Sequence, residues 1–435
     1  MEIRNEIKAA EIRAEPVDYT VGTSRDRIQE EAVDKLFRYN NLLLKWGTAT
    51  GKSRVAVLAC DRLVREAEPG YPPYILIFVA ETSHKENWKK EFIKFLGKER
   101  AESVLRYVII ECYASMKKYA DTECTLLIAD ECHHLQSEKR QEILETIESE
   151  YVLALSATPG RAAYDALSWT FGRFEIDEVS IQDAIDSEYL PEPRIVCIPL
   201  ELERFERTET INMKMSSRTA ITVSDNWSNR WKYLRNKQKY ARYEITFHCT
   251  QKEKYEYINE QFEYWKKQYF RNQGNERIKN LWLQWGSRRK RFLGELKTAR
   301  TLELIKGLRE SSRRFICFCS SIEQAHTLGG ERAVHSQNKN SPAVIKAFND
   351  RKIDEIFAVG MLVEGVTLTE LNSCVIIQLD GNERQFIQKM GRGMRSKNPC
   401  IYIFYYKDTR DEEYLQKALE GINEEYIEYE SDNRD

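Results

Sequence analysis

The chain has 435 residues, of which 42% are hydrophobic, and its formal net charge is −2 at pH 7. This length suits two or three domains with substantial cores, whereas the net charge by itself indicates no particular partner. No stretch is apolar enough to cross a membrane, the charged N-terminus is not a signal peptide, and the ten Cys show no C-x-x-C pairing. We therefore expect a cytoplasmic protein without a zinc site or a disulfide framework.

A helix is predicted over residues 30–39, and Gln29 stands just before it. The amide of a Gln at this place can read adenine because it donates and accepts hydrogen bonds at once. The alternative is an ordinary residue at the start of a surface helix.

The first motif lies between an apolar run at residues 41–44 and a helix-compatible run from residue 54. It reads Gly47-Thr48-Ala49-Thr50-Gly51-Lys52-Ser53. Small residues let backbone N–H groups close around phosphate oxygens, and a helix N-terminus adds positive partial charge. We expect Lys52 to reach the β- and γ-phosphates of a nucleotide and the Ser53 hydroxyl to hold Mg²⁺. Trp46 stands where the strict pattern has its first Gly, so the alternative is a polar turn that caps a helix.

Strand-like runs at residues 74–80 and 106–110 alternate with helical stretches, and this order predicts a doubly wound parallel sheet. Ligands of such sheets bind beyond the carboxyl ends of the strands. Thr82, Tyr113 and Ser115 fall at those ends and are candidates for contacts with a sugar-phosphate backbone. Helix capping explains a Ser or Thr there about as well.

The second motif is an apolar strand that delivers two adjacent carboxylates, Asp130 and Glu131, to its end. We expect Asp130 to bind the Mg²⁺–nucleotide complex, Glu131 to polarise the attacking water, and His133 to link this loop to its neighbours. Ser156 and Thr158 follow the next strand and are candidates for relaying the nucleotide state. The alternatives are a solvated acidic turn and an ordinary Ser/Thr-Pro turn.

Gly-Thr-Ala-Thr-Gly-Lys-Ser, Asp-Glu-Cys-His and Ser-Ala-Thr-Pro follow one another as motifs I, II and III do in superfamily 2 helicases, and the chain resembles that family. The Asp-Glu-Cys-His form, in place of Asp-Glu-Ala-Asp, places it outside the RNA-remodelling group with that signature. It is more similar to DNA translocase groups, which include restriction-enzyme motor subunits, repair helicases and phage-encoded helicases.

Further stretches resemble motifs IV, V and VI of that family. Their candidate residues are Ser320 and Ser321, Gly365 and Thr367, and Gln388, Arg392 and Arg395. The resemblance implies that the motif IV and V residues face nucleic acid, and that Gly365 also faces the nucleotide. Arg392 and Arg395 share one face of a helical turn, and a guanidinium pair at the γ-phosphate stabilises transition-state charge.

Residues 226–300 carry 19 Lys or Arg against seven Asp or Glu, and five of the eight Trp lie there. Basic side chains can neutralise phosphates and aromatic rings can stack on bases. The basic candidates with the tightest spacing are Arg288, Arg289, Lys290 and Arg291. The alternative is a helical insertion whose aromatic residues form its own core, and both interpretations can hold together.

We therefore predict an α/β protein with two RecA-like domains, at residues 1–195 and 301–435, the second ending in an acidic helical tail. A linker and a mostly helical, basic insertion separate them at residues 196–300. The expected activity is Mg²⁺-dependent ATP hydrolysis coupled to movement along nucleic acid, with DNA favoured. An RNA helicase and a non-hydrolysing clamp are the alternatives. No nuclease constellation is found, so a nuclease or a replication, repair or recombination protein is a possible partner subunit, in the cytosol of a bacterium or of a phage-infected cell.

Overall fold

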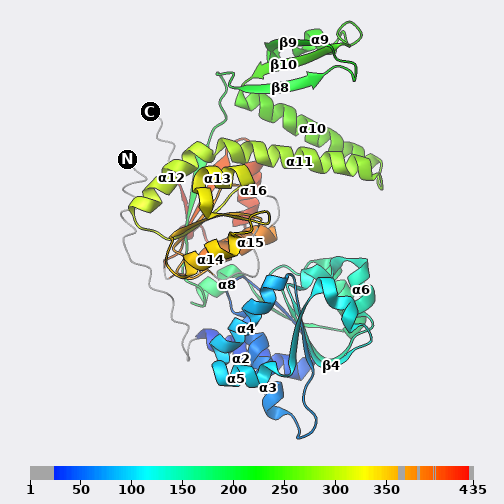
Figure 1. Ribbon diagram of the computed structural model, residues 1–435, viewed down its shortest axis with the longest axis vertical. Coiled ribbons are helices and arrows are strands. Elements are labelled where there is room, and N and C mark those ends of the chain that lie inside the picture. The colour runs from blue at the N-terminus through cyan, green and yellow to red at the C-terminus, as the bar shows by residue number, and fades with distance from the viewer. Residues whose placement is uncertain (1–23, 361–367, 380–382, 395, 397, 431–435) are drawn as a thin grey trace.

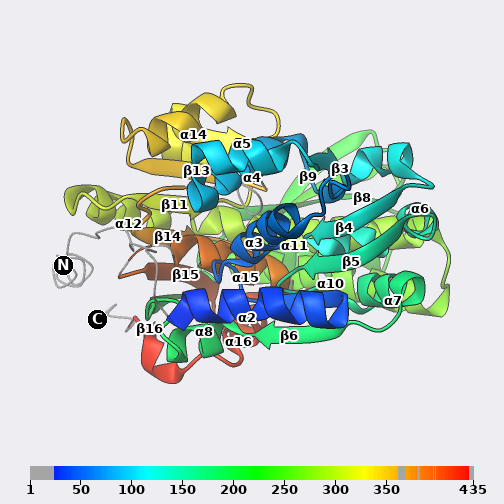
Figure 2. The ribbon, with the colours of Figure 1, turned by 90° about the horizontal axis from the view of Figure 1, so that it is seen from below.

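The computed structural model describes residues 24–360, 368–379, 383–394, 396 and 398–430. Two α/β domains follow one another, and a small sheet with two long helices projects from the second domain (Figure 1). Turning the molecule by 90° shows helices on both sides of the strands (Figure 2). Among the described residues, no helix combines the length and the apolar character needed to cross a membrane.

The first domain is a parallel sheet of six strands in the order β3-β2-β4-β5-β1-β6. Its strands are β1 (Asn41–Trp46), β2 (Ile75–Val79), β3 (Val108–Cys112), β4 (Glu123–Asp130), β5 (Glu148–Leu155) and β6 (Glu175–Val179). Central strands such as β2 are buried along their whole length, because helices cover both faces of a parallel sheet. The carboxyl ends of β1, β2, β4 and β5 therefore meet at one edge, as the sequence predicts.

Alternate residues of these strands feed two separate cores, since side chains of a strand point to opposite faces in turn. Leu42 and Leu44 enter one core, whereas Leu43 enters the other. The helices of this domain are α2 (Ser24–Tyr39), α3 (Lys52–Glu66), α4 (Thr82–Leu96), α5 (Lys98–Leu105), α6 (Glu138–Leu144) and α7 (Arg161–Phe171), with 3-10 turns η1 (Tyr113–Tyr119) and η2 (Cys132–Gln136). Helices α2 to α5 pack on the first core, and η1, α6 and α7 on the second.

The second domain is a parallel sheet of seven strands in the order β12-β13-β11-β14-β15-β7-β16. Its strands are β7 (Arg194–Leu200), β11 (Phe315–Phe318), β12 (Ala333–His335), β13 (Glu355–Val359), β14 (Ser373–Ile376), β15 (Cys400–Tyr406) and β16 (Ile427–Tyr429). Its helices are α8 (Ile181–Asp186), α12 (Thr298–Glu310), α13 (Ile322–Gly329), α14 (Ser341–Asn349), α15 (Glu383–Gly393) and α16 (Arg410–Leu419), with 3-10 turns η4 (Gly330–Arg332) and η5 (Glu424–Tyr426). The acidic tail thus contains the predicted helix and also a sheet strand that the sequence did not indicate.

The chain crosses into the second domain earlier than the predicted boundary at residue 195. Helix α8 already buries Ile181, Ala184 and Ile185 in the core of the second domain, and β7 pairs with β15 and β16. The two prolines before β7 therefore lead into a strand of the second sheet. An extended Pro-containing stretch has the same local conformation in a linker and before a strand.

The insertion contains the predicted helices together with a sheet that was not predicted. Its helices are α9 (Arg230–Leu234), α10 (Gln251–Arg271) and α11 (Glu276–Leu296), with a 3-10 turn η3 (Trp227–Asn229). Its strands are β8 (Glu209–Lys214), β9 (Ile221–Asn226) and β10 (Tyr243–Cys249), in the order β8-β10-β9. Strands β8 and β9 have polar outer faces and few apolar residues, so their sequence does not indicate a sheet.

Candidate active site

The loop between β1 and α3 has the backbone of a phosphate-binding turn. Ala49 and Gly51 take positive φ angles of 69° and 100°, and the Thr50 hydroxyl donates to the Gly47 carbonyl at 2.7 Å. The Lys52 ammonium donates to the carbonyls of Trp46 and Gly47 at 2.9 and 3.2 Å. Burial lowers the pKa of Lys52, and the nearby carboxylates of Glu131 and Asp130 oppose that shift.

Trp46 does not disturb this loop, although it stands where the motif has a Gly. It is the last residue of β1, its side chain is buried in the core, and its indole N–H donates to Asp177 on β6 at 3.0 Å. Only the Trp46 carbonyl faces Lys52. The bulky side chain therefore packs in the core beneath the sheet edge, away from the backbone N–H groups of the loop.

Gln29 has a different role from the predicted adenine contact. It lies inside α2, is 1% exposed, and donates to the Thr50 carbonyl at 2.9 Å. Its amide oxygen accepts a hydrogen bond from Arg54. A Cβ on Gly51 would lie 2.0 Å from the Gln29 amide nitrogen, so only a Gly lets the two segments approach. The amide nitrogen and the amide oxygen of Gln29 thus both stabilise the loop and the start of α3.

The two acids of the second motif are held in different ways. Asp130 ends β4, and its Oδ2 accepts a hydrogen bond from the Trp88 indole at 2.8 Å. Glu131 follows with a φ of 48°, and its Oε2 lies 3.3 Å from His133 Nδ1 and 3.4 Å from the Ser156 hydroxyl. The same His133 nitrogen lies 3.5 Å from Ser156. The predicted link from His133 to Ser156 is therefore present, and it converges on Glu131.

Thr158 takes part through its backbone, since its N–H donates to the Ser156 hydroxyl at 3.2 Å. Ser53 lies in the first turn of α3, directly after Lys52. A carboxylate and a hydroxyl at one edge of the sheet are oxygen donors of the kind that Mg²⁺ takes alongside nucleotide phosphates. The side chains of Ser53 and Asp130 thus fit a magnesium ion.

Helix α15 of the second domain meets the phosphate-binding loop of the first. A Cβ on Gly391 would lie 2.4 Å from the Thr48 Cβ, and Ala49 packs against the core of the second domain. Gln388 lies about one helical turn before Gly391, and Arg392 follows it directly. Both side chains are buried, with exposed fractions of 3% for Gln388 and 5% for Arg392. Three of the predicted site residues, Gly365, Thr367 and Arg395, lie outside the described residues.

This contact gives a first prediction. Gly391→Ala should lower kcat for ATP hydrolysis by about tenfold, because overpacking a tight contact costs roughly 1–3 kcal/mol. Ala is otherwise favoured over Gly inside a helix, so a loss would report the contact between domains and not a weaker α15. A second change, Thr48→Gly, removes the opposing Cβ and should restore the rate. An unchanged rate in Gly391→Ala would show that the two domains separate at this point during turnover.

Family comparisons match both halves of the chain. Residues 24–161 match the family described as "Type III restriction enzyme, res subunit", and residues 296–397 match "Helicase conserved C-terminal domain". The chain belongs to helicase superfamily 2. The first family covers most of the first α/β domain, and the second covers most of the second domain.

Two known proteins are similar to this helicase over most of its length. A Methanocaldococcus jannaschii protein that is provisionally named an ATP-dependent RNA helicase is 22% identical over 347 residues, which cover 68% of this chain and 44% of that protein. The helicase thus spans less than half the length of this curated relative. The crystal structure of the Pyrococcus furiosus Hef helicase domain covers 92% of this chain and all of that domain, with a TM-score of 0.50 and 14% identity. That likeness shows the shared fold.

The predicted nucleic-acid contacts of the first domain divide into exposed and buried residues. Thr82 is exposed at the start of α4, and Ser115 is half-buried. Tyr113 is only 2% exposed, and its hydroxyl donates to the backbone oxygen of Asp130 at 2.9 Å. We therefore correct the role of Tyr113, which supports the acidic loop from within the core and does not face a nucleic-acid strand.

Ser320 and Ser321 lie after β11, and each has a partner within the second domain. The Ser320 hydroxyl donates to the Gln324 side chain at 2.9 Å. Ser321 is buried and caps α13 by accepting from the Gln324 backbone N–H at 3.1 Å. The structure therefore gives Ser321 the helix-capping role in place of the predicted contact.

Only part of the basic cluster on α11 is available to a ligand. Arg288 and Arg291 are exposed and Lys290 is half-buried. Arg289 is 2% exposed and donates to the Asn259 side chain at 2.6 Å and to the Tyr414 hydroxyl at 3.0 Å. We correct its predicted phosphate contact, because Arg289 fixes α11 to α10 and α16.

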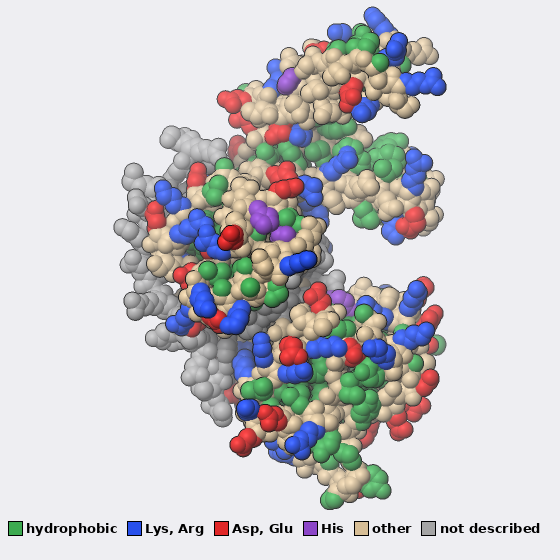
Figure 3. Space-filling view, in the orientation of Figure 1, with side chains coloured by type: hydrophobic (Ala, Val, Ile, Leu, Met, Phe, Trp, Pro, Cys, Tyr) green, Lys and Arg blue, Asp and Glu red, His purple; other side chains and the backbone are tan. Residues whose placement is uncertain are grey.

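The aromatic residues of the insertion mostly form its own core, whereas most of its basic residues other than Arg289 and Lys297 are exposed or half-buried. Trp227 packs against Phe247 and Tyr257, and Trp282 stacks on Tyr269. Lys and Arg side chains gather over the outer end of the small sheet, and the molecule is hollowed between the α10–α11 hairpin and the first domain (Figure 3). The packing of the aromatic residues into a core of the insertion is therefore present, whereas the contact of the basic residues with nucleic acid stays a prediction.

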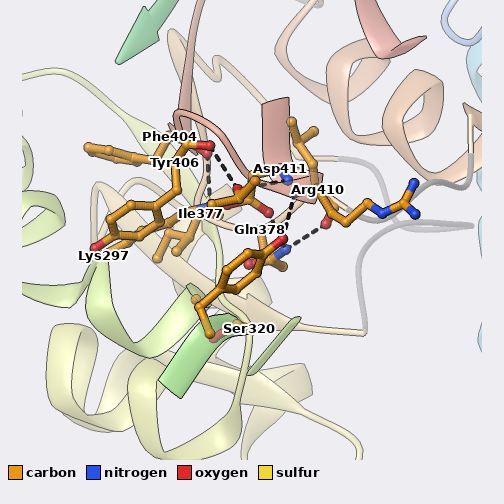
Figure 4. A network of polar contacts seen from close by, with 12 residues as sticks. Lys297, Ser320, Ile377, Gln378, Phe404, Tyr406, Arg410 and Asp411 are labelled. Atoms are coloured by element: carbon orange, nitrogen blue, oxygen red, sulfur yellow. Dashed lines mark hydrogen bonds and ion pairs between the residues drawn. The ribbon is translucent and has the colours of Figure 1, made fainter. Parts of the chain in front are cut away.

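A buried polar network joins the insertion to the second domain (Figure 4). Lys297, between α11 and α12, is fully buried and lies 2.5 Å from Asp411 of α16. Its ammonium also donates to the carbonyls of Ile377 and Phe404 at 2.7 and 2.9 Å. The other Asp411 oxygen accepts from Gln378 at 3.0 Å. Burial lowers the pKa of Lys297, and Asp411 opposes that shift.

The same network lies next to Ser320. A Cβ on Gly294, near the end of α11, would lie 2.4 Å from the Ser320 side chain, and Gln324 donates to the Gly294 carbonyl at 2.7 Å. Neither Lys297 nor Trp88 was predicted as part of the site. In the sequence both residues resemble ordinary residues of a helical stretch. No local pattern marks them, because their partners lie 114 and 42 residues away along the chain.

Proposed function

We propose that this helicase is an ATP-dependent DNA helicase or translocase whose ATP site is shared between its two domains. The observation that carries the proposal is the contact of α15 with the phosphate-binding loop at Gly391 and Thr48. Gln388 and Arg392 lie on the same helix as Gly391, which supports a place for them at the ATP site. Hydrolysis is then tied to the relative position of the two domains, which is what a stepping motor requires.

In this proposal the loop from Gly47 to Ser53 holds the phosphates, with Lys52 at the β- and γ-oxygens. Ser53 and Asp130 hold Mg²⁺, which when bound neutralises charge on the phosphates. Glu131 positions the attacking water and takes its proton. Arg392, with Arg395, stabilises charge on the transferred phosphoryl group.

The link from Glu131 through His133 and Ser156 to Thr158 supports a coupling role for these residues. A change at the γ-phosphate that moves Glu131 also moves the loop after β5. Exposed Thr82, Arg288 and Arg291, with Ser115 and Lys290, remain candidates for the nucleic-acid track.

DNA is favoured over RNA because the family matched by the first domain is described by a restriction-enzyme subunit, and restriction enzymes act on DNA. That description also supports a separate nuclease subunit as a possible partner. The name of the Methanocaldococcus jannaschii relative keeps an RNA helicase as the second candidate. The intact Lys52, Asp130 and Glu131 disfavour a non-hydrolysing clamp.

The test is steady-state ATP hydrolysis, measured alone and with single-stranded DNA, duplex DNA, forked DNA and RNA. We expect a DNA form to stimulate the rate and Lys52→Ala to abolish it, because that change removes the cation at the phosphates. Stimulation by RNA alone would establish the second candidate. Nucleotide binding without hydrolysis under any condition would establish the clamp.

A further inference from the structure

We propose that Trp88 is a positioning residue that sets the affinity of the site for its divalent cation, through a hydrogen bond to the Asp130 carboxylate. The inference rests on the proposed function. Trp88 lies on α4, is 4% exposed, and its indole N–H donates to Asp130 Oδ2 at 2.8 Å.

Asp130 is held from both faces of the sheet at once. Trp88 belongs to the core on one face and Tyr113 to the core on the other. The indole fixes the carboxylate, whereas the Tyr113 hydroxyl fixes the Asp130 carbonyl at 2.9 Å. The backbone and the side chain of the acid are therefore oriented by two separate donors, and each donor is anchored in a packed core.

The chemistry of the pair suits a metal site. An indole N–H is only a donor, so the bond holds one carboxylate oxygen in a fixed direction at every pH at which Asp130 is ionised. Fixing Oδ2 also fixes the direction of the second oxygen. Residues that orient a metal ligand in this way typically change metal affinity 10- to 100-fold when they are replaced.

A buried Trp generally finds some acceptor for its N–H, and a backbone carbonyl would serve for packing alone. Here the acceptor is a carboxylate beside Lys52, close enough for Asp130 to oppose the lowering of the Lys52 pKa. The acceptor of the Trp88 hydrogen bond is therefore one of the charged groups of the proposed phosphate site. Its loss should change the cation requirement more than the stability of the fold.

The experiment compares the full chain carrying Trp88→Phe with Phe92→Leu as the matched control. Phe92 lies one turn further along α4, is buried in the same core, and its ring lies 6.4 Å from that of Trp88. Binding of a fluorescent, non-hydrolysable ATP analogue is followed by anisotropy as Mg²⁺ is added. ATP hydrolysis is measured against Mg²⁺ in parallel, and thermal unfolding reports the packing cost of each change.

We expect Trp88→Phe to need about tenfold more Mg²⁺ at half-saturation in both assays, with unchanged affinity for the analogue in EDTA. Phe92→Leu should lower the melting temperature and leave the Mg²⁺ requirement unchanged. Equal shifts in the two variants, or a matching loss of affinity in EDTA, would overturn the role of Trp88. Failure of the wild-type chain to bind or hydrolyse nucleotide would instead overturn the proposed function and this inference with it.

Discussion

Glu131→Gln should lower kcat for ATP hydrolysis by about 10²–10⁴-fold, because it removes the group that takes the proton of the attacking water. Gln has nearly the same shape, and its amide oxygen can still accept from the Ser156 hydroxyl that lies 3.4 Å from Glu131. Nucleotide affinity should therefore be retained. Single-turnover hydrolysis and equilibrium binding of an ATP analogue measure the two quantities separately.

The matched control is Glu142→Gln, which makes the same chemical change at an exposed position of α6 in the same domain. It should leave both quantities at the wild-type level. If Glu131→Gln retains hydrolysis within a few-fold of the wild type, Glu131 is not the base, and the proposed mechanism fails at that step. Loss of nucleotide binding in this variant would show that the side chain holds the loop and not the water.

Asp411→Ala should destabilise the protein by about 3–5 kcal/mol, because it leaves the Lys297 ammonium buried without its ionic partner. Both side chains are almost fully buried, and they lie 2.5 Å apart. The insertion and α16 are attached through this pair, so both should loosen together. Urea unfolding followed by circular dichroism measures the change, and hydrogen exchange shows where it falls.

A double-mutant cycle separates the interaction energy of Lys297 with Asp411 from the contributions of their other neighbours. Lys297→Met removes the charge but leaves the Ile377 and Phe404 carbonyls without their donor, at a cost of roughly 1–3 kcal/mol each. Lys297→Met with Asp411→Ala should therefore destabilise less than the sum of the single changes. Asp350→Ala, which breaks an exposed ion pair with Lys346, is the control and should have no measurable effect. Additive losses in the cycle would show that the two charges do not depend on each other.

The phosphate-binding loop shows how much of the site could be predicted locally. A strand, small residues and a helix start fix the loop backbone by themselves, since the positive φ angles at Ala49 and Gly51 come from the turn. The side chains that the loop presents are then known from the sequence. The same holds for Asp130 and Glu131, because residues at the end of an apolar parallel strand must lie at the ligand edge of the sheet.

Three of the errors share one cause, which is contact with residues far along the chain. Gln29, Tyr113 and Arg289 each carry a polar group that suits a ligand, and each is bound instead to a protein group 17 to 125 residues away. Sequence pattern cannot distinguish a polar group that meets solvent from one that is satisfied inside the fold, because both need only a hydrogen-bond partner.

The sequence by itself thus determined the fold class, the order of the motifs and which polar side chains stand at the strand ends, because strand periodicity and short loops specify these over a few residues. Only the tertiary structure decided that the chain enters the second domain at α8, that β8 and β9 form a sheet, and that α15 lies on the phosphate-binding loop. It also decided which polar side chains are buried, as with Trp88 on Asp130 and Lys297 on Asp411. The physical reason is that burial and pairing are properties of packed surfaces, which bring together segments that no local pattern connects.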